Sequence, residues 1–377
     1  MIDKISAVPF AGSTLESLGQ CKFKANRKFS MALSKSFQKG QTILACQMCE
    51  EEKKQRTEKE EIRLVDTTNY RYNSLPNFVP GCIKQQTIAS MYGYLLKPKF
   101  NTFRKLKTTF PYIHCMVYTN GSMWMSNFTL SSIEHISFLS DLSIIKKCTV
   151  NVSDVARIQL SNSGDLFLSR KKSSLYIYQP KTGKIVKSKF SVAPLIINSA
   201  FHISKNNKII VGAREDGPLL PPNGPRKVIV MNMEGEREMT YHLDSKSKPI
   251  FTAPYQITTD NNYDIYVGDL LKNDKEGRVI KLNNGGGVSD VYMGHPEIND
   301  SDHPLILADL KSTSSNNIIV ADDKNGILHI LDNNVQCIHF VRTKELGIVN
   351  PNSIEIDNET IFIGCGSEIF KVKFSGV

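Results

Sequence analysis

Cys46 and Cys49 are two cysteines whose C-x-x-C spacing is typical of zinc ligands. Thiolates at this spacing supply two of the four protein ligands that a structural zinc ion requires. No other cysteine follows before Cys82, and no histidine occurs before His114. We therefore expect the pair to bind no metal tightly by itself, and zinc to be held only if another chain completes the site.

Basic side chains form two clusters that could bind phosphate or carboxylate groups. The members of the two clusters are Lys97, Lys99, Arg104, Lys105 and Lys107 in the first, and Arg170, Lys171 and Lys172 in the second. Phenylalanines interleave with the first cluster, and basic groups beside aromatic rings can hold phosphates and stack unpaired bases. Lysines on an edge strand also prevent edge-to-edge aggregation, which is the interpretation we favour for the first cluster. The second cluster is the better candidate for a partner or nucleic-acid surface.

The net positive charge lies in the first half of the chain. The whole sequence of 377 residues has 47 Lys+Arg and 37 Asp+Glu, a net charge of +10. Residues 1–190 carry 29 and 13 of these, giving +16, and residues 191–377 carry 18 and 24, giving −6. This asymmetry indicates either association with an acidic protein or single-stranded RNA, or a basic surface that is simply solvated.

Composition excludes several classes of protein. A hydrophobic fraction of 40% with 22% charged residues is typical of globular proteins rather than of disordered chains. No apolar run reaches the roughly 18–20 residues that span a bilayer. Eight cysteines are too few for a disulfide scaffold. These features predict a cytoplasmic protein with free thiols and no membrane partner.

A short apolar segment behind a Gly, Asn or Asp turn recurs along the chain and indicates the elements that would position these residues. The six copies end at Ser126, Ser169, Gly212, Gly268, Ala321 and Gly364. Successive copies are 43, 43, 56, 53 and 43 residues apart, which is close to the length of a four-stranded propeller blade. The longer intervals contain insertions at residues 215–225 and 295–303.

The last repeat has one strand fewer than the others, because the sequence ends after residues 368–374. An incomplete blade leaves an open sheet edge unless another segment supplies the missing strand. We expect residues 99–108 to be that outer strand. The predicted fold is therefore an all-β, six-bladed propeller closed by an N-terminal strand.

The repeats resemble NHL repeats. The matching segments are residues 254–257 (Pro-Tyr-Gln-Ile), 264–269 (Asp-Ile-Tyr-Val-Gly-Asp), 277–282 (Gly-Arg-Val-Ile-Lys-Leu) and 317–322 (Asn-Ile-Ile-Val-Ala-Asp). Residues 75–81 (Leu-Pro-Asn-Phe-Val-Pro-Gly) are similar to the join between coiled coil and propeller in invertebrate tripartite-motif-like proteins. Residues 36–40 and 46–54 resemble the opening of a B-box zinc finger. The chain thus resembles a shortened member of that family, in which a truncated B-box start is joined to an NHL-type propeller.

The expected organisation has four parts. They are a poorly ordered segment over residues 1–45, a helical B-box-like start over 46–65, a linker over 66–96 and the propeller over 97–377. The resemblance implies a substrate receptor of a ubiquitin-ligase-like protein, with longer tripartite-motif relatives as further partners. Because no RING precedes the B-box-like segment, ubiquitin transfer is not expected.

The function that these features predict is a non-enzymatic recognition module that binds a protein partner or RNA through the propeller. Two alternatives stay open: an RNA-binding regulator acting through the basic half, and a metal-dependent propeller hydrolase or lyase. The eight histidines show no ligand spacing on one element, and Asp165, Asp264, Asp269, Asp322 and Asp323 lie at turns, where Asp caps the backbone. No catalytic residue and no cofactor are therefore predicted.

Overall fold

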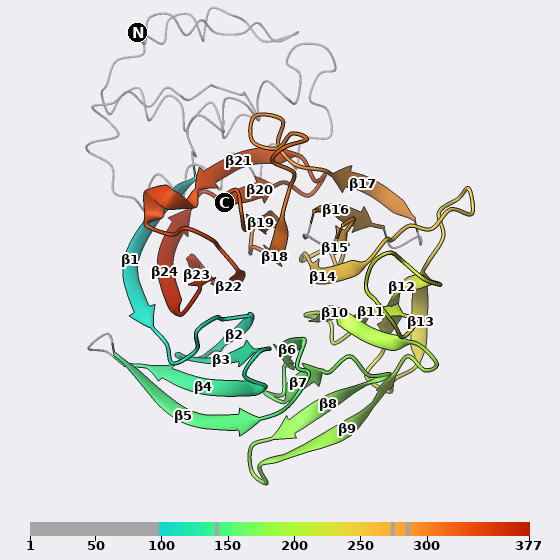
Figure 1. Cartoon of the computed structure of the whole chain (residues 1–377), viewed down its shortest axis with the longest axis horizontal. Coiled ribbons are helices and arrows are strands. Elements are labelled where there is room, and N and C mark those ends of the chain that lie inside the picture. The colour runs from blue at the N-terminus through green and yellow to red at the C-terminus, as the bar shows by residue number, and fades with distance from the viewer. Residues whose placement is uncertain (1–97, 140–142, 273–275, 284–286) are drawn as a thin grey trace, which may run out of the picture. The chain divides into compact units, whose positions relative to one another are not determined.

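The computed structural model describes residues 98–139, 143–272, 276–283 and 287–377. Pro98–Val377 form one compact unit, in which six four-stranded antiparallel sheets surround a common axis (Figure 1). Within the described residues the only helical element is a single 3-10 turn, η3 (Thr343–Leu346). The prediction of an all-β, six-bladed propeller is confirmed. The three segments predicted for residues 1–96 lie outside the described residues.

The first three blades follow one another along the chain, each with its first strand innermost. Blade 1 consists of β2 (Cys115–Thr119), β3 (Ser122–Asn127), β4 (Ser132–Phe138) and β5 (Ile144–Asn151). Blade 2 consists of β6 (Arg157–Leu160), β7 (Leu166–Ser169), β8 (Ser174–Gln179) and β9 (Lys184–Ser191). Blade 3 consists of β10 (Ile196–Ile203), β11 (Ile209–Arg214), β12 (Arg226–Met231) and β13 (Arg237–Tyr241).

The other three blades complete the ring, and the sixth takes its outer strand from the other end of the unit. Blade 4 consists of β14 (Pro254–Thr259), β15 (Ile265–Leu270), β16 (Gly277–Leu282) and β17 (Val288–Tyr292). Blade 5 consists of β18 (Leu307–Ser312), β19 (Ile318–Asp322), β20 (Ile327–Leu331) and β21 (Cys337–Arg342). Blade 6 consists of β22 (Ser353–Asp357), β23 (Thr360–Cys365), β24 (Glu368–Ser375) and β1 (Lys99–Lys107).

Strand β1 closes the ring. It pairs antiparallel with β24, with Lys99 opposite Ser375 and Lys107 opposite Glu368, and its register shifts between Thr102 and Arg104. Predicted residues 99–108 therefore do supply the outer strand of the sixth blade. The edge of β24, which would otherwise be open, is paired along its length.

Close packing between blades explains why each recurring segment ends in a small residue. Ser126, Ser169 and Ala321 are fully buried at this position. A Cβ on Gly268 would lie 2.4 Å from Leu307 Cδ2 in the next blade, and one on Gly212 would lie 3.0 Å from Pro254 Cβ in the next blade. There is no room for a larger side chain here, because the neighbouring inner strand approaches the sheet closely.

The hydrophobic core is divided into six clusters, one at each interface between neighbouring blades. At the closing interface, Leu106 of β1 and Phe362 of β23 pack with Met123 and Ile136 of blade 1. Each blade is thus held on both faces, which fixes the inner strands around the axis. In the described part of the chain, no helix has the length and apolar character needed to cross a membrane.

Candidate functional site

A buried ion pair joins two blades on opposite sides of the ring. Arg157 begins β6 of blade 2, and Asp309 lies in β18 of blade 5. The Arg157 guanidinium is 2.5 Å from Asp309 Oδ1, and both side chains are almost inaccessible to solvent. Because the inner strands neighbour one another in chain order, blades 2 and 5 face each other across the axis (Figure 1). The long arginine side chain therefore spans the centre of the propeller.

Backbone groups hold the carboxylate in place. Asp309 Oδ1 also accepts a hydrogen bond from its neighbour Leu310 N at 2.9 Å, and Oδ2 accepts one from Ile354 N of blade 6 at 3.1 Å. Burial by itself would lower the pKa of Arg157, but the adjacent Asp309 carboxylate raises it above the ordinary value for arginine. The guanidinium is therefore a permanent cation at the axis.

A second ion pair links blades 5 and 6. Lys311 Nζ lies 2.6 Å from Glu355 Oε2, and both side chains are only slightly exposed. Burial raises the pKa of Glu355, although Lys311 opposes that effect. Burial would lower the pKa of Lys311, but Glu355 and Asp309 raise it. Lys311 is thus charged, and Glu355 takes up a proton more easily than an ordinary glutamate does.

His202 completes the cluster from blade 3. Its Nε2 lies 3.0 Å from Thr259 Oγ1 of blade 4. Burial, with the positive charges of Lys311 and Arg157, lowers the pKa of His202 to about 3. The imidazole is therefore neutral at physiological pH. Five ionisable side chains from blades 2, 3, 5 and 6 form this group, and we call Arg157, His202, Asp309, Lys311 and Glu355 the axial cluster.

Four buried side-chain atoms of the inner strands lack a hydrogen-bond partner among the described residues. They are Arg157 Nε, Ser199 Oγ, Gln256 Oε1 and Ser353 Oγ. The amide nitrogen of Gln256 is used, since it donates to Ala308 O at 2.8 Å. Buried polar groups are almost always paired. Unpaired groups that include the Arg157 donor and the Gln256 acceptor therefore indicate that a small polar molecule can bind beside the axial cluster.

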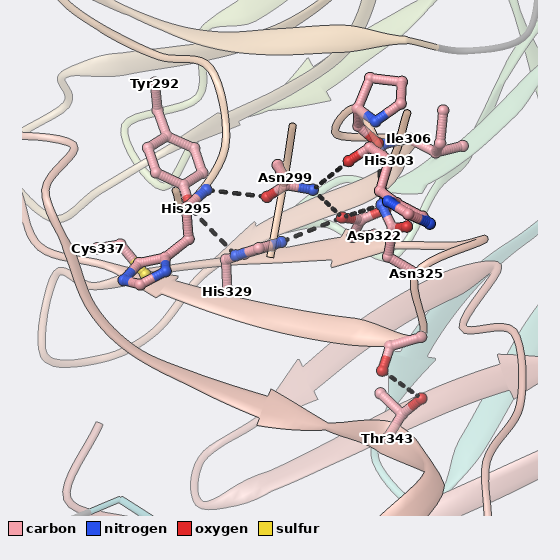
Figure 2. Close-up of polar contacts among 12 residues, drawn as sticks. Tyr292, His295, Asn299, His303, Ile306, Asp322, Asn325, His329, Cys337 and Thr343 are labelled. Atoms are coloured by element: carbon pink, nitrogen blue, oxygen red, sulfur yellow. Dashed lines mark hydrogen bonds and ion pairs between the residues drawn. The ribbon is translucent and has the colours of Figure 1, made fainter. Parts of the chain in front are cut away.

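A second buried polar group, drawn in Figure 2, lies between blades 4 and 5. His329 contacts the Tyr292 hydroxyl through Nδ1 at 3.0 Å and Asp322 Oδ2 through Nε2 at 3.3 Å. Asp322 also accepts hydrogen bonds from Ile306 N at 3.0 Å and from Asn299 Nδ2 at 2.9 Å. Asp322 thus binds the segment that precedes β18 of blade 5, through Asn299 and Ile306.

Blade 4 repeats this arrangement with other partners. Asp269, at the corresponding place in β15, accepts hydrogen bonds from Thr252 N and Ala253 N and pairs with Arg278 at 2.9 Å. The two aspartates therefore bind the backbone of the incoming segment, but from buried positions in β15 and β19, not from turns as predicted. Their role is to hold the ring together, and we do not assign a reaction to the group in Figure 2.

The predicted site residues of the first basic cluster lie on the closing strand. The side chains of Lys99, Lys105 and Lys107 are exposed, while Arg104 is half-buried. Lys105 pairs with Glu368 of β24 at 2.8 Å. Lys97 lies outside the described residues. These lysines therefore lie on the outer edge of blade 6. Two strands, β24 and β23, separate them from the inner strand β22, which contributes Glu355 to the axial cluster.

The second basic cluster forms a surface at the junction of blades 1 and 2. Arg170 lies 5.0 Å from the centre of the Tyr176 ring and donates to Ser153 O at 3.1 Å. Lys171 Nζ lies 4.3 Å above the Phe128 ring. Lys172 is exposed. The structure therefore keeps Arg170, Lys171 and Lys172 apart from the first cluster, with blade 1 between them.

The remaining predicted ligands, Cys46 and Cys49, lie outside the described residues, so the half-site for zinc stays a prediction. Among the residues that the structure does describe, no group of three His, Cys, Asp or Glu side chains could hold a metal ion. Both carboxylates of the axial cluster are already paired with a cation. A metal site at the axis does not fit these residues.

Inspection of the sequence did not single out the axial cluster. The available signal was the alternation of polar and apolar residues just before each recurring segment, as in residues 157–159 (Arg-Ile-Gln), 309–311 (Asp-Leu-Lys) and 353–355 (Ser-Ile-Glu). In a propeller these strands are the innermost ones. Polar residues at their alternate positions are therefore candidates for the axis.

Comparison with known proteins identifies the fold. No protein-family model and no curated protein sequence matches the chain. A gluconolactonase from Xanthomonas campestris has a TM-score of 0.53 and 10% identity, over 74% of this chain and 89% of that protein. A luciferin-regenerating enzyme has a TM-score of 0.53 and 10% identity, over 74% and 96%. A candidate gluconolactonase has a TM-score of 0.52 and 12% identity, over 75% and 95%.

The chain has the six-bladed propeller fold. At 10–12% identity this likeness shows the fold alone. It nevertheless corrects the prediction that the chain is not an enzyme, because these three solved structures are described as two gluconolactonases and a luciferin-regenerating enzyme. That prediction rested on the tripartite-motif-like resemblance and on the lack of ligand spacing among the histidines of any one element. It took no account of ionisable groups at the axis.

Proposed function

We propose that the chain is a propeller enzyme that hydrolyses a small neutral ester or lactone at the ring axis. The observation that carries this proposal is the axial cluster, in which five ionisable side chains lie together with little exposure to solvent, and four of them, all except Asp309, have shifted pKa values. Such shifts are concentrated at functional sites. The two ion pairs leave the cluster without net charge, which favours an uncharged polar substrate over an ion. Likeness to proteins described as gluconolactonases supports a lactone as the first substrate to test.

Each charged member has a role in such a reaction. Glu355 accepts the proton of a water molecule that adds to the carbonyl carbon, and returns it to the alkoxide when the ring C–O bond breaks. Lys311 and Arg157 stabilise the negative charge that develops on the carbonyl oxygen. Neutral His202 forms a hydrogen bond to the substrate without adding charge. The products are one hydroxy acid per lactone, and no metal is required.

The test is a lactonase assay with the full chain. We expect glucono-δ-lactone or another member of a panel of five- and six-membered lactones to release acid, measured with a pH indicator. Replacing Glu355 by Gln should reduce kcat by about 100-fold or more, since general base catalysis contributes roughly 10²–10⁴. Because ionised Glu355 is the base, activity should fall as pH is lowered through its raised pKa.

A matched control is available on the surface. Lys208 and Glu238 form an ion pair of 2.5 Å that is partly exposed. E238Q should leave activity unchanged, since Glu238 lies in β13, the outer strand of blade 3. Absence of acid release from every lactone, or equal activity of E355Q and E238Q, would contradict the proposed function.

The relationship to tripartite-motif-like proteins is a separate proposal, and it rests on the quoted NHL-type and B-box-like segments. It predicts that Cys46 and Cys49 bind zinc only together with another chain. Elemental analysis of the purified full chain, compared with C46S/C49S, checks this prediction. Stoichiometric zinc in the isolated monomer would contradict it, because two thiolates leave zinc half-coordinated.

A further inference from the structure

The loop that carries Arg170, Lys171 and Lys172 packs against a loop of blade 1. The two loops follow β7 and β3, so they lie at the same end of neighbouring blades. Contact is made by Lys171, whose Nζ is 4.3 Å from the centre of the Phe128 ring. We call the surface formed by Phe128, Leu130, Arg170, Lys171 and Lys172 the basic–aromatic surface.

The blade 1 side of this surface is apolar and exposed. Phe128 is 40% exposed and Leu130 is 52% exposed, although a large apolar side chain gains free energy when it is buried. Their positions are fixed, because Asn127 Oδ1 accepts hydrogen bonds from Leu130 N and Thr129 Oγ1, each at 2.7 Å. Two apolar side chains held in solvent within one short loop are typical of a contact surface.

The blade 2 side is cationic and preorganised. Arg170, Lys171 and Lys172 form no ion pair with any Asp or Glu of the described residues. Arg170 is held by Ser153, and Lys171 has a left-handed backbone with φ of 50°. A residue other than glycine adopts this conformation at a cost, which persists where surrounding contacts over-determine it. Arg170 and Lys171 are therefore held in place without an acidic partner.

We propose that the basic–aromatic surface binds an extended protein segment that carries Asp or Glu residues beside a bulky apolar side chain. Carboxylates of the segment pair with Lys171, Lys172 and Arg170, and its apolar side chain covers Leu130 and the open edge of Phe128. The combination of uncompensated cations with two exposed apolar groups is complementary to that chemistry. This inference is independent of the axial cluster and of lactone hydrolysis.

The geometry favours a peptide over nucleic acid. Binding of single-stranded nucleic acid uses aromatic rings as platforms on which bases stack. Lys171 already covers one face of Phe128, and Leu130 is aliphatic, so the surface offers no free two-sided stacking platform. Binding of RNA is thus one of the outcomes that would overturn the proposal.

The experiment selects peptides from a random twelve-residue phage library on the immobilised full chain. Peptides that pair Asp or Glu with Leu, Ile or Phe should be enriched. The best one, made with a fluorescent label, is then titrated by anisotropy against four proteins: wild type, K171E/K172E, F128S and K246E/K248E. Lys246 and Lys248 are exposed on a loop of blade 3, so their double reversal is a matched control.

We expect K171E/K172E to weaken binding at least 10-fold, F128S to weaken it by a similar factor and K246E/K248E to have no effect. All four proteins should keep the thermal midpoint of the wild type, because the substituted side chains are exposed. Enrichment of peptides without acidic residues, or equal loss of affinity in the blade 3 control, would overturn the proposal. So would binding of labelled oligouridine that K171E/K172E abolishes while no peptide is enriched.

Discussion

Arg157 and Asp309 illustrate how strongly one residue can depend on a partner that is distant in sequence. Each charge is buried, and each is tolerated only because the other lies 2.5 Å away. The desolvation of two charges offsets much of their attraction. The pair is therefore a weak net source of stability, while the loss of either member alone leaves an uncompensated charge at the axis.

The first prediction concerns this pair. D309A should lower the free energy of unfolding by about 3–5 kcal/mol, because the Arg157 guanidinium stays buried without its partner. The double variant R157M/D309L should recover most of that loss. Urea denaturation followed by tryptophan fluorescence measures both. K208A, which removes an exposed ion pair, should cost under about 1 kcal/mol, and a D309A effect no larger than that of K208A would contradict the prediction.

The second prediction concerns His202 and acid. Its pKa is about 3 in the folded protein and about 6.5 in an unfolded chain. Between these values the unfolded chain binds more protons, so stability falls as pH is lowered from 6.5 toward 3. The loss should be on the order of 5 kcal/mol, from about 3.5 pKa units at about 1.4 kcal/mol each. Thermal midpoints measured over this pH range should depend less steeply on pH in H202N, and parallel curves would contradict this account.

At the scale of elements, the small residue at the end of each second strand sets the distance between blades. Gly268 shows this most directly, since a side chain there would overlap Leu307 and Leu310 of the next blade. Blade 5 has Ala321 at the corresponding position, and blades 1 and 2 have serine. The requirement is therefore for a small volume, not for the backbone freedom of glycine.

The third prediction follows from this packing. G268A should destabilise the protein by about 1–3 kcal/mol, because the added methyl group forces the buried leucines out of position. G287A is the matched control, since a Cβ there meets no atom closer than 3.7 Å. The free energy of unfolding of G287A, measured by urea denaturation, should stay within about 0.5 kcal/mol of the wild-type value. Equal midpoints for the two variants would show that the interface adjusts without cost.

At the scale of the whole molecule, the ring is closed by non-covalent pairing of its two ends. Strand β1 joins β24, and Leu106 contributes to the core between blades 6 and 1. Blade 6 therefore packs against blade 5 on one face and against blade 1 on the other. Without β1 the edge of β24 would be unpaired and able to associate with another chain.

The fourth prediction compares two truncations. A chain that begins at Pro98 keeps β1 and should fold with the thermal midpoint of the full-length propeller. A chain that begins at Thr108 lacks β1, and its midpoint should fall by about 5–10 °C, given roughly 2–4 °C per kcal/mol for a unit of this size. Size-exclusion chromatography should show association of the shorter chain. Identical behaviour of the two truncations would exclude a closing role for β1.

Much of the fold could be predicted from local patterns. The six recurring segments and their spacing predict a six-bladed ring, and the short last blade predicts that residues 99–108 close it. The structure confirms both the six blades and the closing strand. The site was predicted less well. Arg170, Lys171 and Lys172 could be recognised as a surface cluster from their run alone, whereas Phe128, which Lys171 contacts, could not.

The sequence by itself determined the blades of this protein, because each hairpin joins neighbouring segments and its turn residues and apolar alternation act locally. Only the tertiary structure decided which polar residues meet at the axis. Arg157 and Asp309 are separated by 152 residues, and neither has a local pattern that specifies the other. They meet because six inner strands converge on one line, and burial there then sets the charge states on which the proposed chemistry depends.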